Sequence, residues 1–288
     1  MTRWLVILCA VLLAFPAAAK EKASRFSAMT YNIRLDLASD GDNAWPHRRK
    51  ALTSLIAYHA PDLVGMQEVL QHQKDQIEAD LPAYQFVGVA RDDGKQAGEY
   101  SMLGYRTDRF DLLASGTFWL SPTPDRPGKG WDAAYPRVAT WARLRDKSAR
   151  RTMLMVNTHF DHVGEVARLE SAKLIRRWIG EHRAPGDAVV LTGDFNVPIG
   201  TPPYQAILAD TPGLVALYDT QDISRTPHFG PQGTYTAFNI EQVEPSPIDH
   251  IFVSDGVAVL RHATLTQQTG GKLPSDHYPV IADLCIGC

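Results

Sequence analysis

The chain has 288 residues, a formal net charge of −3 and 44% hydrophobic residues. This length suits one large α/β domain or two small ones. The mild acidity argues against strong non-specific binding of duplex nucleic acid, because such binding depends on many Lys and Arg contacts to phosphate. A local basic patch is still compatible with this charge.

The first 19 residues have the pattern of a secretory signal peptide. Arg3 supplies a positive charge, the apolar run LVILCAVLLAF follows, and small residues end the segment at Ala17–Ala19. The run is short for a bilayer span, although a membrane anchor is the alternative interpretation. We predict a signal peptide over 1–19, one folded domain over 20–288, export to the periplasm or medium, and no stable membrane span after cleavage.

Short apolar segments with strand character recur along the rest of the chain. In order, they are residues 26–33, 62–69, 85–90, 100–106, 116–120, 139–144, 152–160, 188–195, 250–254 and 278–284. Several of these strands are consecutive, and helical patterns separate others. The mixture predicts an α/β sandwich, in which two sheets pack face to face with helices outside.

Helical spacing of apolar residues predicts helices over 47–59, 71–81 and 164–183. The run HRRK at the start of the first helix resembles a phosphate-binding patch, but a solvated helix face is the commoner arrangement. Pro and Gly gather at 121–130 and 198–213, which we predict as surface loops. Neither loop divides the chain into two domains, because the strand pattern resumes on each side.

Cys285 and Cys288 are the two cysteines that follow the predicted signal peptide. In an oxidising compartment they can form a structural disulfide that ties down the tail, or they can remain as free thiols. A redox motif normally opens a helix beside a strand, and a metal site needs more than two ligands. Neither of these functions is therefore favoured.

Polar side chains occur where the predicted strands begin or end. Asp194 and Asn196 follow the run AVVLTG, and residues i and i+2 of an extended segment point the same way. A turn is the ordinary explanation for such residues. The pattern recurs, however, at Asn32, Gln67-Glu68, Asn157-His159-Asp161, Asp249-His250 and Asp276-His277. Six occurrences favour one shared site, because α/β folds build sites at strand ends.

The motifs at these positions resemble those of one family. YNIR, MQEV, GEYSMLGYR, NTHFDH, GDFN, IDHIFVS and SDHYPV are similar, in order and spacing, to the signature of the endonuclease/exonuclease/phosphatase (DNase I-like) superfamily. The similarity runs from about Phe26 to Leu284, and its details look most like a bacterial secreted subgroup near the carbon catabolite repressor 4/nocturnin-like branch. It implies a four-layer α/β sandwich and a catalytic domain that hydrolyses phosphoesters with Mg²⁺.

The resemblance implies a metal site made of oxygen ligands. Glu68 is the first expected ligand, with Asn32 beside it, and Asp276 is a further one. Carboxylate and carboxamide oxygens suit a hard divalent ion. A set that is rich in oxygen and poor in thiol favours Mg²⁺, with Mn²⁺ as the alternative, over structural zinc.

Phosphoester hydrolysis also needs an oriented water, charge stabilisation and a protonated leaving oxygen. By the resemblance, Asp194 would orient or deprotonate the water, and Asn196 would hold a phosphate oxygen or a water of the metal. His277 would stabilise the pentacovalent phosphate or act as acid, and Asp249 would fix its tautomer. His250 faces away from Asp249 in an extended segment, so we leave it out of the site.

Four further residues are expected at the opposite wall and the rim. His159 would donate to the phosphate or leaving group, oriented by Glu99, although Glu99 could instead be an exposed loop charge. Arg137 would bind phosphate through its planar fork, with a surface salt bridge as the alternative. Trp131 would stack on a base or sugar from its Gly-rich loop, although tryptophans more often pack in cores or rims.

The expected substrate is a phosphate ester: a nucleic acid, a sugar phosphate or a phospholipid headgroup. A nuclease would need basic and aromatic residues along a cleft, whereas a phosphatase of inositides or sugar phosphates would need a compact basic pocket. A sphingomyelinase would need an exposed apolar hairpin that dips into the membrane, and the sequence has no such Trp- and Phe-rich insertion. Export argues against a cytosolic deadenylase. A hypothesis of another class is an inactive binding module on the same fold. We expect a monomer.

Overall fold

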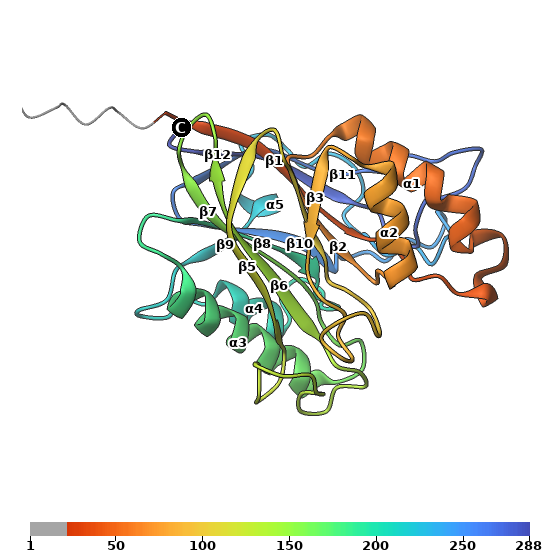
Figure 1. The fold of residues 1–288 in the computed structure, drawn as a ribbon, viewed down its shortest axis with the longest axis horizontal. Coiled ribbons are helices and arrows are strands. Elements are labelled where there is room, and N and C mark those ends of the chain that lie inside the picture. Colours follow the sequence, from red (N-terminus) through yellow and green to blue (C-terminus); the bar gives the residue numbers. More distant parts are fainter. Residues whose placement is uncertain (1–21) are drawn as a thin grey trace, which may run out of the picture.

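Two six-stranded sheets packed face to face form the centre of the molecule (Figure 1). A computed structural model describes residues 22–288, so the predicted signal peptide over 1–19 lies outside the described residues. The first sheet contains, in spatial order, β11 (Val257–Thr264), β12 (Val280–Ile286), β1 (Ser24–Asn32), β2 (Leu63–Gln67), β4 (Leu103–Arg106) and β3 (Tyr84–Val87). The second contains β5 (Phe110–Trp119), β6 (Val138–Asp146), β7 (Thr152–His159), β8 (Ala188–Asp194), β10 (Asp249–Ser254) and β9 (Leu217–Asp219).

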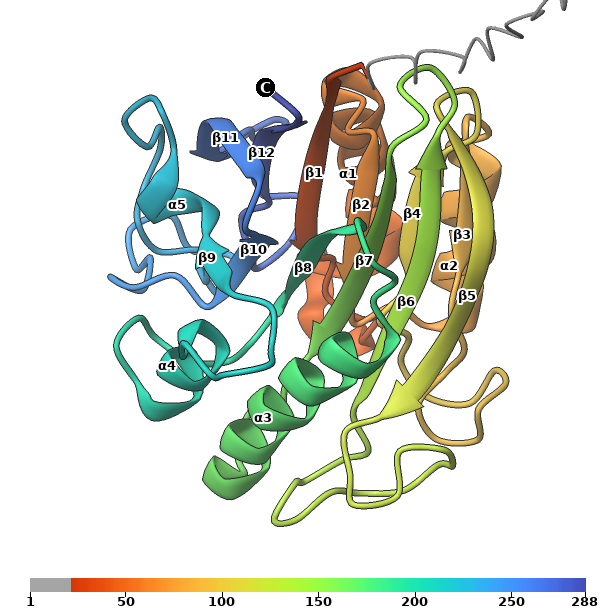
Figure 2. The same ribbon diagram turned by 90° about the vertical axis from the view of Figure 1, so that its left-hand side faces the viewer.

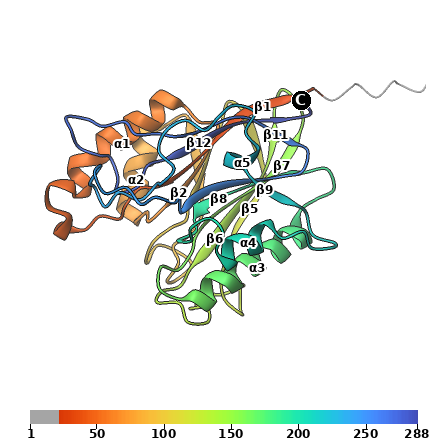
Figure 3. The same ribbon diagram turned by 180° about the vertical axis from the view of Figure 1, so that it is seen from behind.

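Helices cover the outer face of each sheet, which completes four layers (Figures 2 and 3). The first sheet packs against α1 (Trp45–His59) and α2 (Gln71–Asp80), which follow the short 3₁₀ segment η1 (Ala38–Asn43). The second packs against α3 (Glu165–His182) and α4 (Pro202–Leu208). The single turn α5 (Thr220–Ile223) follows β9. The predicted four-layer α/β sandwich is confirmed.

The alternation of side chains along the strands explains the layers. In β8, Ala188 and Val190 pack between the sheets, whereas Val189 and Leu191 pack against the helices. The next inward positions are Thr192 and Asp194, because successive side chains point to opposite faces. The apolar core between the sheets therefore gives way to polar residues toward the carboxyl end of β8.

Two sequence predictions about elements were wrong. The predicted surface loop 198–213 contains α4, whose Tyr204 and Ile207 are buried against the second sheet. The strands β9 and β11 were not predicted, and each is an edge strand. β9 has only 3 residues, and a bulge in β11 between Val259 and Arg261 interrupts the alternation of its side chains. Within residues 22–288, no helix combines the length and the hydropathy that a bilayer span requires.

Candidate active site

The register of the second sheet brings three predicted site residues into line. Asp194 of β8 lies between His159 of β7 and Asp249 of β10. Residues directly opposite one another on neighbouring strands project from the same face, and here that face meets the first sheet. On β10 the same alternation turns His250 outward, where Nδ1 contacts Asp219 at 2.8 Å. The predicted exclusion of His250 from the site agrees with this arrangement.

The first sheet supplies the other half of the site. Asn32, at the end of β1, donates from Nδ2 to Glu68 Oε1 at 3.0 Å and to Asp194 Oδ2 at 2.9 Å. The backbone N–H groups of Arg34 and Leu35 donate to Asn32 Oδ1 and Glu68 Oε2, at 3.0 and 3.1 Å. The amide oxygen of Asn32 is thus engaged by the backbone, and its NH₂ group joins carboxylates of the two sheets. Its expected role as a metal ligand stays a prediction.

Three residues of the site have a strained backbone. The φ angles of Arg34, Glu68 and Asn196 are 57°, 60° and 50°. Residues other than glycine seldom adopt such values, which cost of order 1–3 kcal/mol each when the surroundings impose them. At Asn196 the conformation directs the backbone N–H to Asp194 Oδ1 at 2.9 Å. Strain that gathers where polar groups converge is typical of functional sites.

His277 and Asp249 form a buried pair, as predicted. Asp249 Oδ2 lies 2.8 Å from His277 Nδ1, and Nε2 of the same ring lies 3.8 Å from Asp194 Oδ2. Burial favours the neutral imidazole, but the Asp249 carboxylate outweighs burial and raises the pKa of His277 well above its ordinary value. Burial, and then the charge of Asp249, raise the pKa of Asp194. The site therefore holds a charged imidazole beside a carboxylate that binds protons readily.

His159 approaches Asp194 from the other side. Its Nε2 lies 3.6 Å from Asp194 Oδ2 and 3.1 Å from Asn196 Nδ2. Burial, and then Arg137, hold the pKa of His159 well below its ordinary value, so the ring is neutral. The Asn196 NH₂ group donates to Nε2, and the ring proton therefore lies on Nδ1.

The predicted contact between Glu99 and His159 is longer than a hydrogen bond. Glu99 Oε2 lies 3.9 Å from His159 Nδ1, and it accepts a hydrogen bond from Arg91 Nη1 at 2.7 Å. His159 Nδ1 has no hydrogen-bond partner within residues 22–288. Glu99 therefore faces the ring and is held by Arg91.

These groups open into one cavity of about 630 Å³. Its lining includes the predicted residues Glu68, Glu99, Arg137, His159, Asp194, Asn196, Asp276 and His277. Residues that sequence reasoning missed complete the wall: Arg34, Arg91, Tyr135, His162 and Tyr235. The loops that carry most of these residues have no period that would reveal them, although Arg34 belongs to the YNIR motif. The predicted residues other than Trp131 thus converge, as one shared site requires.

Two rim predictions have different outcomes. Trp131 does not line the cavity, and Tyr135 of the same loop takes that position. The side chain of Tyr135 lies beside Arg91, whose guanidinium is 5.0 Å from the ring centroid. Arg137 is only 4% exposed and contacts Asp161 Oδ2 at 3.3 Å through Nε, while its Nη1 has no partner among the described residues. The stacking role of Trp131 is therefore not supported, whereas Arg137 offers a free N–H group at the cavity.

The side chain of Arg48, in the HRRK run, is buried. It is 4% exposed and donates to the carbonyl groups of Ile33, Arg34 and Pro274, the last at 3.2 Å. The segment after β1 is thereby held beside the segment that leads to Asp276. His47 and Lys50 of the same run are exposed, as a solvated helix face requires, whereas the guanidinium of Arg48 is a buried clamp.

Comparison with known proteins agrees with the geometry. A sequence model of the Endonuclease/Exonuclease/phosphatase family matches residues 29–277. The chain belongs to this family. A family protein of Bacteroides thetaiotaomicron is 36% identical, with a TM-score of 0.88 over 93% of this chain and 97% of that chain. A mannosyl-6-phosphatase of the same organism is 37% identical, with a TM-score of 0.85 over 90% and 99%.

The chain is also similar to more distant proteins, and the solved structure among them shares its fold. The human nocturnin catalytic domain, with a bound sulfate anion, is 20% identical, with a TM-score of 0.69 over 90% of this chain and 94% of that chain. An uncharacterized protein of Acanthamoeba polyphaga mimivirus is 22% identical over 282 residues. The chain covers 40% of the length of that curated relative, and the match covers 83% of this chain.

The family generally uses a divalent metal, and the donor set of this chain fits such an ion. Glu68 and Asp276 line the same cavity. Burial raises the pKa of Asp276, and the neighbouring Glu68 carboxylate raises it further. A hard cation would relieve this repulsion and accept these oxygen ligands.

A second group with the spacing of metal ligands consists of Asp194, Asp249 and His277. Its ligand atoms lie within 4.8 Å of one another. Asp249 and His277 are, however, already bonded to each other, and the raised pKa of His277 keeps its ring protonated. A protonated imidazole has no lone pair for a metal, so the Glu68 side of the cavity is the better metal site.

Proposed function

We propose that the protein is an exported, Mg²⁺-dependent phosphatase that hydrolyses phosphomonoesters of small sugars. The observation that carries this proposal is the cavity of about 630 Å³, which combines Arg34, Arg91 and Arg137 with the rings of Tyr135 and Tyr235. Pockets for small molecules have volumes of about 300–1,000 Å³. Guanidinium groups suit phosphate oxygens, and tyrosine offers an apolar face with a hydroxyl group. The likeness to a mannosyl-6-phosphatase supports this substrate class.

The side chains of the site suit an in-line attack of water on phosphorus. Burial raises the pKa of Asp194, so it accepts a proton more readily than an ordinary carboxylate, and we assign it the orientation or deprotonation of the water. His277, kept charged by Asp249, would offer a charged N–H group from Nε2 to the phosphoryl oxygens. Asn196 and His159 contact each other beside Asp194 and would hold the other side of the phosphoryl group.

Glu68 and Asp276 would hold the metal ion, with Asn32 beside them. A divalent ion bound there supplies positive charge that stabilises the phosphate oxygens. We assign Mg²⁺ because the donors are hard oxygens, and Mn²⁺ is the alternative.

A substrate screen tests the proposal directly. Purified protein that lacks residues 1–19 is assayed with hexose 6-phosphates, p-nitrophenyl phosphate, bis-p-nitrophenyl phosphate, and single-stranded DNA and RNA, each with Mg²⁺ and with EDTA. We expect the hexose phosphates to have the highest kcat/KM and EDTA to abolish turnover. Hydrolysis that survives EDTA contradicts the metal assignment. Binding of a hexose phosphate without turnover would identify an inactive binding module.

A nuclease is the second candidate function, because one observation favours it. Tyr135 lines the cavity and is 51% exposed, so its ring is accessible to a stacked base. In the same screen, a higher kcat/KM for DNA or RNA than for hexose phosphates would select this candidate.

Export has two independent supports. Residues 1–19 have the signal-peptide pattern, and Cys285 and Cys288 are joined by a disulfide, a bond that persists in oxidising compartments. Mass spectrometry of the protein recovered from periplasm and medium measures its N-terminus. We expect a chain that begins near Lys20, and an uncleaved chain confined to the cytoplasm would contradict export.

A further inference from the structure

Asn157 of β7 lies between the two sheets, and its side chain uses its full hydrogen-bonding capacity. Its Nδ2 donates to the carbonyl oxygens of Met66 in β2 and of Met102, which directly precedes β4, at 2.9 and 2.8 Å. Its Oδ1 accepts from Gln67 Nε2 at 2.7 Å and from Thr192 Oγ1 at 3.0 Å. The residue is 0% exposed. A carboxamide has two donors and two acceptor positions, and all four are filled here.

Gly65 provides the space for this amide. A Cβ atom at Gly65 would lie 2.3 Å from Asn157 Oδ1 and 2.3 Å from Thr192 Oγ1. Any other residue at position 65 would therefore displace the amide or separate the sheets. The side chain of Asn157 reaches across the sandwich to the backbone of the opposite sheet only because this position has no side chain.

The amide and its partners lie one layer beneath the candidate active site. Gln67 Nε2 also donates to Thr30 Oγ1 at 3.0 Å. Residues i and i+2 of a strand share a face, so Thr30, Asn157 and Thr192 each support a residue of the site. The supported pairs are Thr30 with Asn32, Asn157 with His159 and Thr192 with Asp194, and Gln67 directly precedes Glu68.

We propose that Asn157 is a positioning residue that fixes the two halves of the site relative to each other. Glu68 and Asn32 belong to the first sheet, and Asp194 and His159 belong to the second. Apolar contacts between the sheets have no preferred direction, whereas four hydrogen bonds to one amide define a single register. The functional part of this inference rests on the proposed phosphatase activity. A displacement of about 1 Å can lower a rate about a hundredfold.

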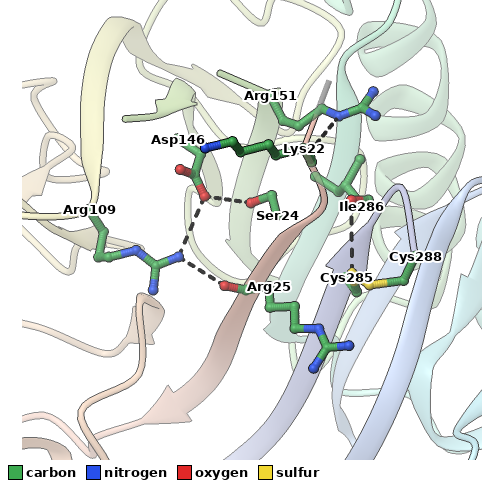
Figure 4. Close-up of a disulfide and its surroundings, with 9 residues drawn as sticks. All are labelled: Lys22, Ser24, Arg25, Arg109, Asp146, Arg151, Cys285, Ile286 and Cys288. Atoms are coloured by element: carbon green, nitrogen blue, oxygen red, sulfur yellow. Dashed lines mark hydrogen bonds and ion pairs between the residues drawn. A yellow bond between two sulfur atoms is a disulfide. The ribbon is translucent and has the colours of Figure 1, made fainter. Parts of the chain in front are cut away.

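The chain offers a matched control at the other end of the same sheets. Ser24 Oγ donates to Asp146 Oδ2 at 2.6 Å, and both residues are buried (Figure 4). This bond also joins β1 of the first sheet to β6 of the second. It differs from the Asn157 layer in lying at the opposite end of β1 from Asn32, so it supports no residue of the site.

The test compares Asn157→Leu, Thr192→Val and Ser24→Ala. For each variant, urea unfolding gives stability, p-nitrophenyl phosphate gives kcat and KM, and the rise of Tm with Mg²⁺ gives metal affinity without turnover. We expect Asn157→Leu to lower kcat about a hundredfold and Thr192→Val about tenfold. Both should raise the Mg²⁺ concentration for half-maximal Tm rise severalfold. Ser24→Ala should lose stability but keep the kcat and the Mg²⁺ requirement of the wild type.

Two results would overturn the positioning role. One is a folded Asn157 or Thr192 variant with wild-type kcat and Mg²⁺ requirement, and the other is a Ser24 variant with an equal loss of kcat. If Asn157→Leu does not fold, Thr192→Val decides, because valine preserves the shape of threonine. If the wild type hydrolyses no phosphate ester, the proposed function fails, and the Mg²⁺-dependent Tm rise of the variants still decides the positioning role.

Discussion

The two ends of the sandwich contain the same strands but use buried polar groups differently. At the end shown in Figure 4, Asp146 accepts hydrogen bonds from Ser24 and Ser148 and lies 3.5 Å from Arg109 Nη2. Although burial favours the protonated acid, these hydrogen bonds lower the pKa of Asp146 to about 2. Every bond there supports the charged form, so the carboxylate stabilises the fold.

At the other end, buried polar groups are left with unused capacity. Asp249 Oδ1, His159 Nδ1 and Arg137 Nη1 lack hydrogen-bond partners within the part of the chain that the structure describes. Asp194 has a raised pKa, the reverse of Asp146. Unsatisfied buried groups destabilise a protein unless a ligand completes them. Arg145 Nε, next to Asp146, also lacks a partner among the described residues. The opposite pKa shifts of Asp146 and Asp194 therefore carry the comparison, and they assign stability to one end of the sheets and ligand binding to the other.

Among the tests of this comparison, Asp194→Asn should have the largest effect. Loss of the carboxylate should lower kcat at least about a thousandfold, within the range attributed to general bases. The unfolding free energy at pH 7 should stay equal or rise, because an acid with a raised pKa in the folded state opposes folding at that pH. Turnover of p-nitrophenyl phosphate and urea unfolding measure the two quantities. A variant with normal kcat would remove Asp194 from the mechanism.

Glu68→Gln should change the metal requirement more than the fold. The amide keeps one oxygen, which can accept the bond from Asn32 or the bond from Leu35 but not both, and it loses the charge that attracts a cation. We expect the Mg²⁺ concentration for half-maximal activity to rise at least about tenfold. A titration of rate against Mg²⁺ measures this shift, with Glu78→Gln on α2, outside the cavity lining, as the control. An unchanged titration would show that Glu68 is not a ligand.

Much of this functional end could be predicted from the sequence. The run AVVLTGDFN has the period of a strand and then ends in Asp194 and Asn196, so the polar groups must lie at a strand end. The resemblance in IDHIFVS and SDHYPV added the partners Asp249 and His277, and the sheet register places Asp194 opposite Asp249. Strand period and motif order together were sufficient for this side of the site.

The rest depends on packing that the sequence does not encode locally. The role of Asn157 follows from the close approach of Gly65, which belongs to the other sheet. Tyr135 lines the cavity in place of Trp131 because of the path of an irregular loop, where no period applies. Arg48 is buried by contacts with Pro274, 226 residues away. Such contacts become predictable only when the two sheets are already in place.

Asp146→Asn is the change that corresponds to Asp194→Asn at the Ser24 end of the sandwich. Because the pKa of Asp146 is lowered to about 2, its stabilisation is present above about pH 4 and is lost as the pH falls toward 2. We expect the variant to lose up to about 2 kcal/mol of unfolding free energy at pH 7 and roughly half of that at pH 3, with unchanged kcat. Urea unfolding at both pH values measures the difference. An equal loss at both values would mean that the charge of Asp146 does not stabilise the fold.

The smallest effect is expected from Cys288→Ser. The disulfide of Cys285 with Cys288 closes a loop of sequence separation 3 (Figure 4). Since the entropy that a cross-link removes from the unfolded chain grows with loop length, so short a loop should contribute less than about 2 kcal/mol. Urea unfolding of the variant and the wild type, with and without a reductant, measures this contribution, and kcat should not change. Cys285 is the second-last residue of β12 and lies at the Ser24 end of the sandwich, where β1 pairs with β12. If loss of the disulfide lowered kcat, the two ends would be coupled through the sheets. That result would contradict the division of roles inferred from Asp146 and Asp194.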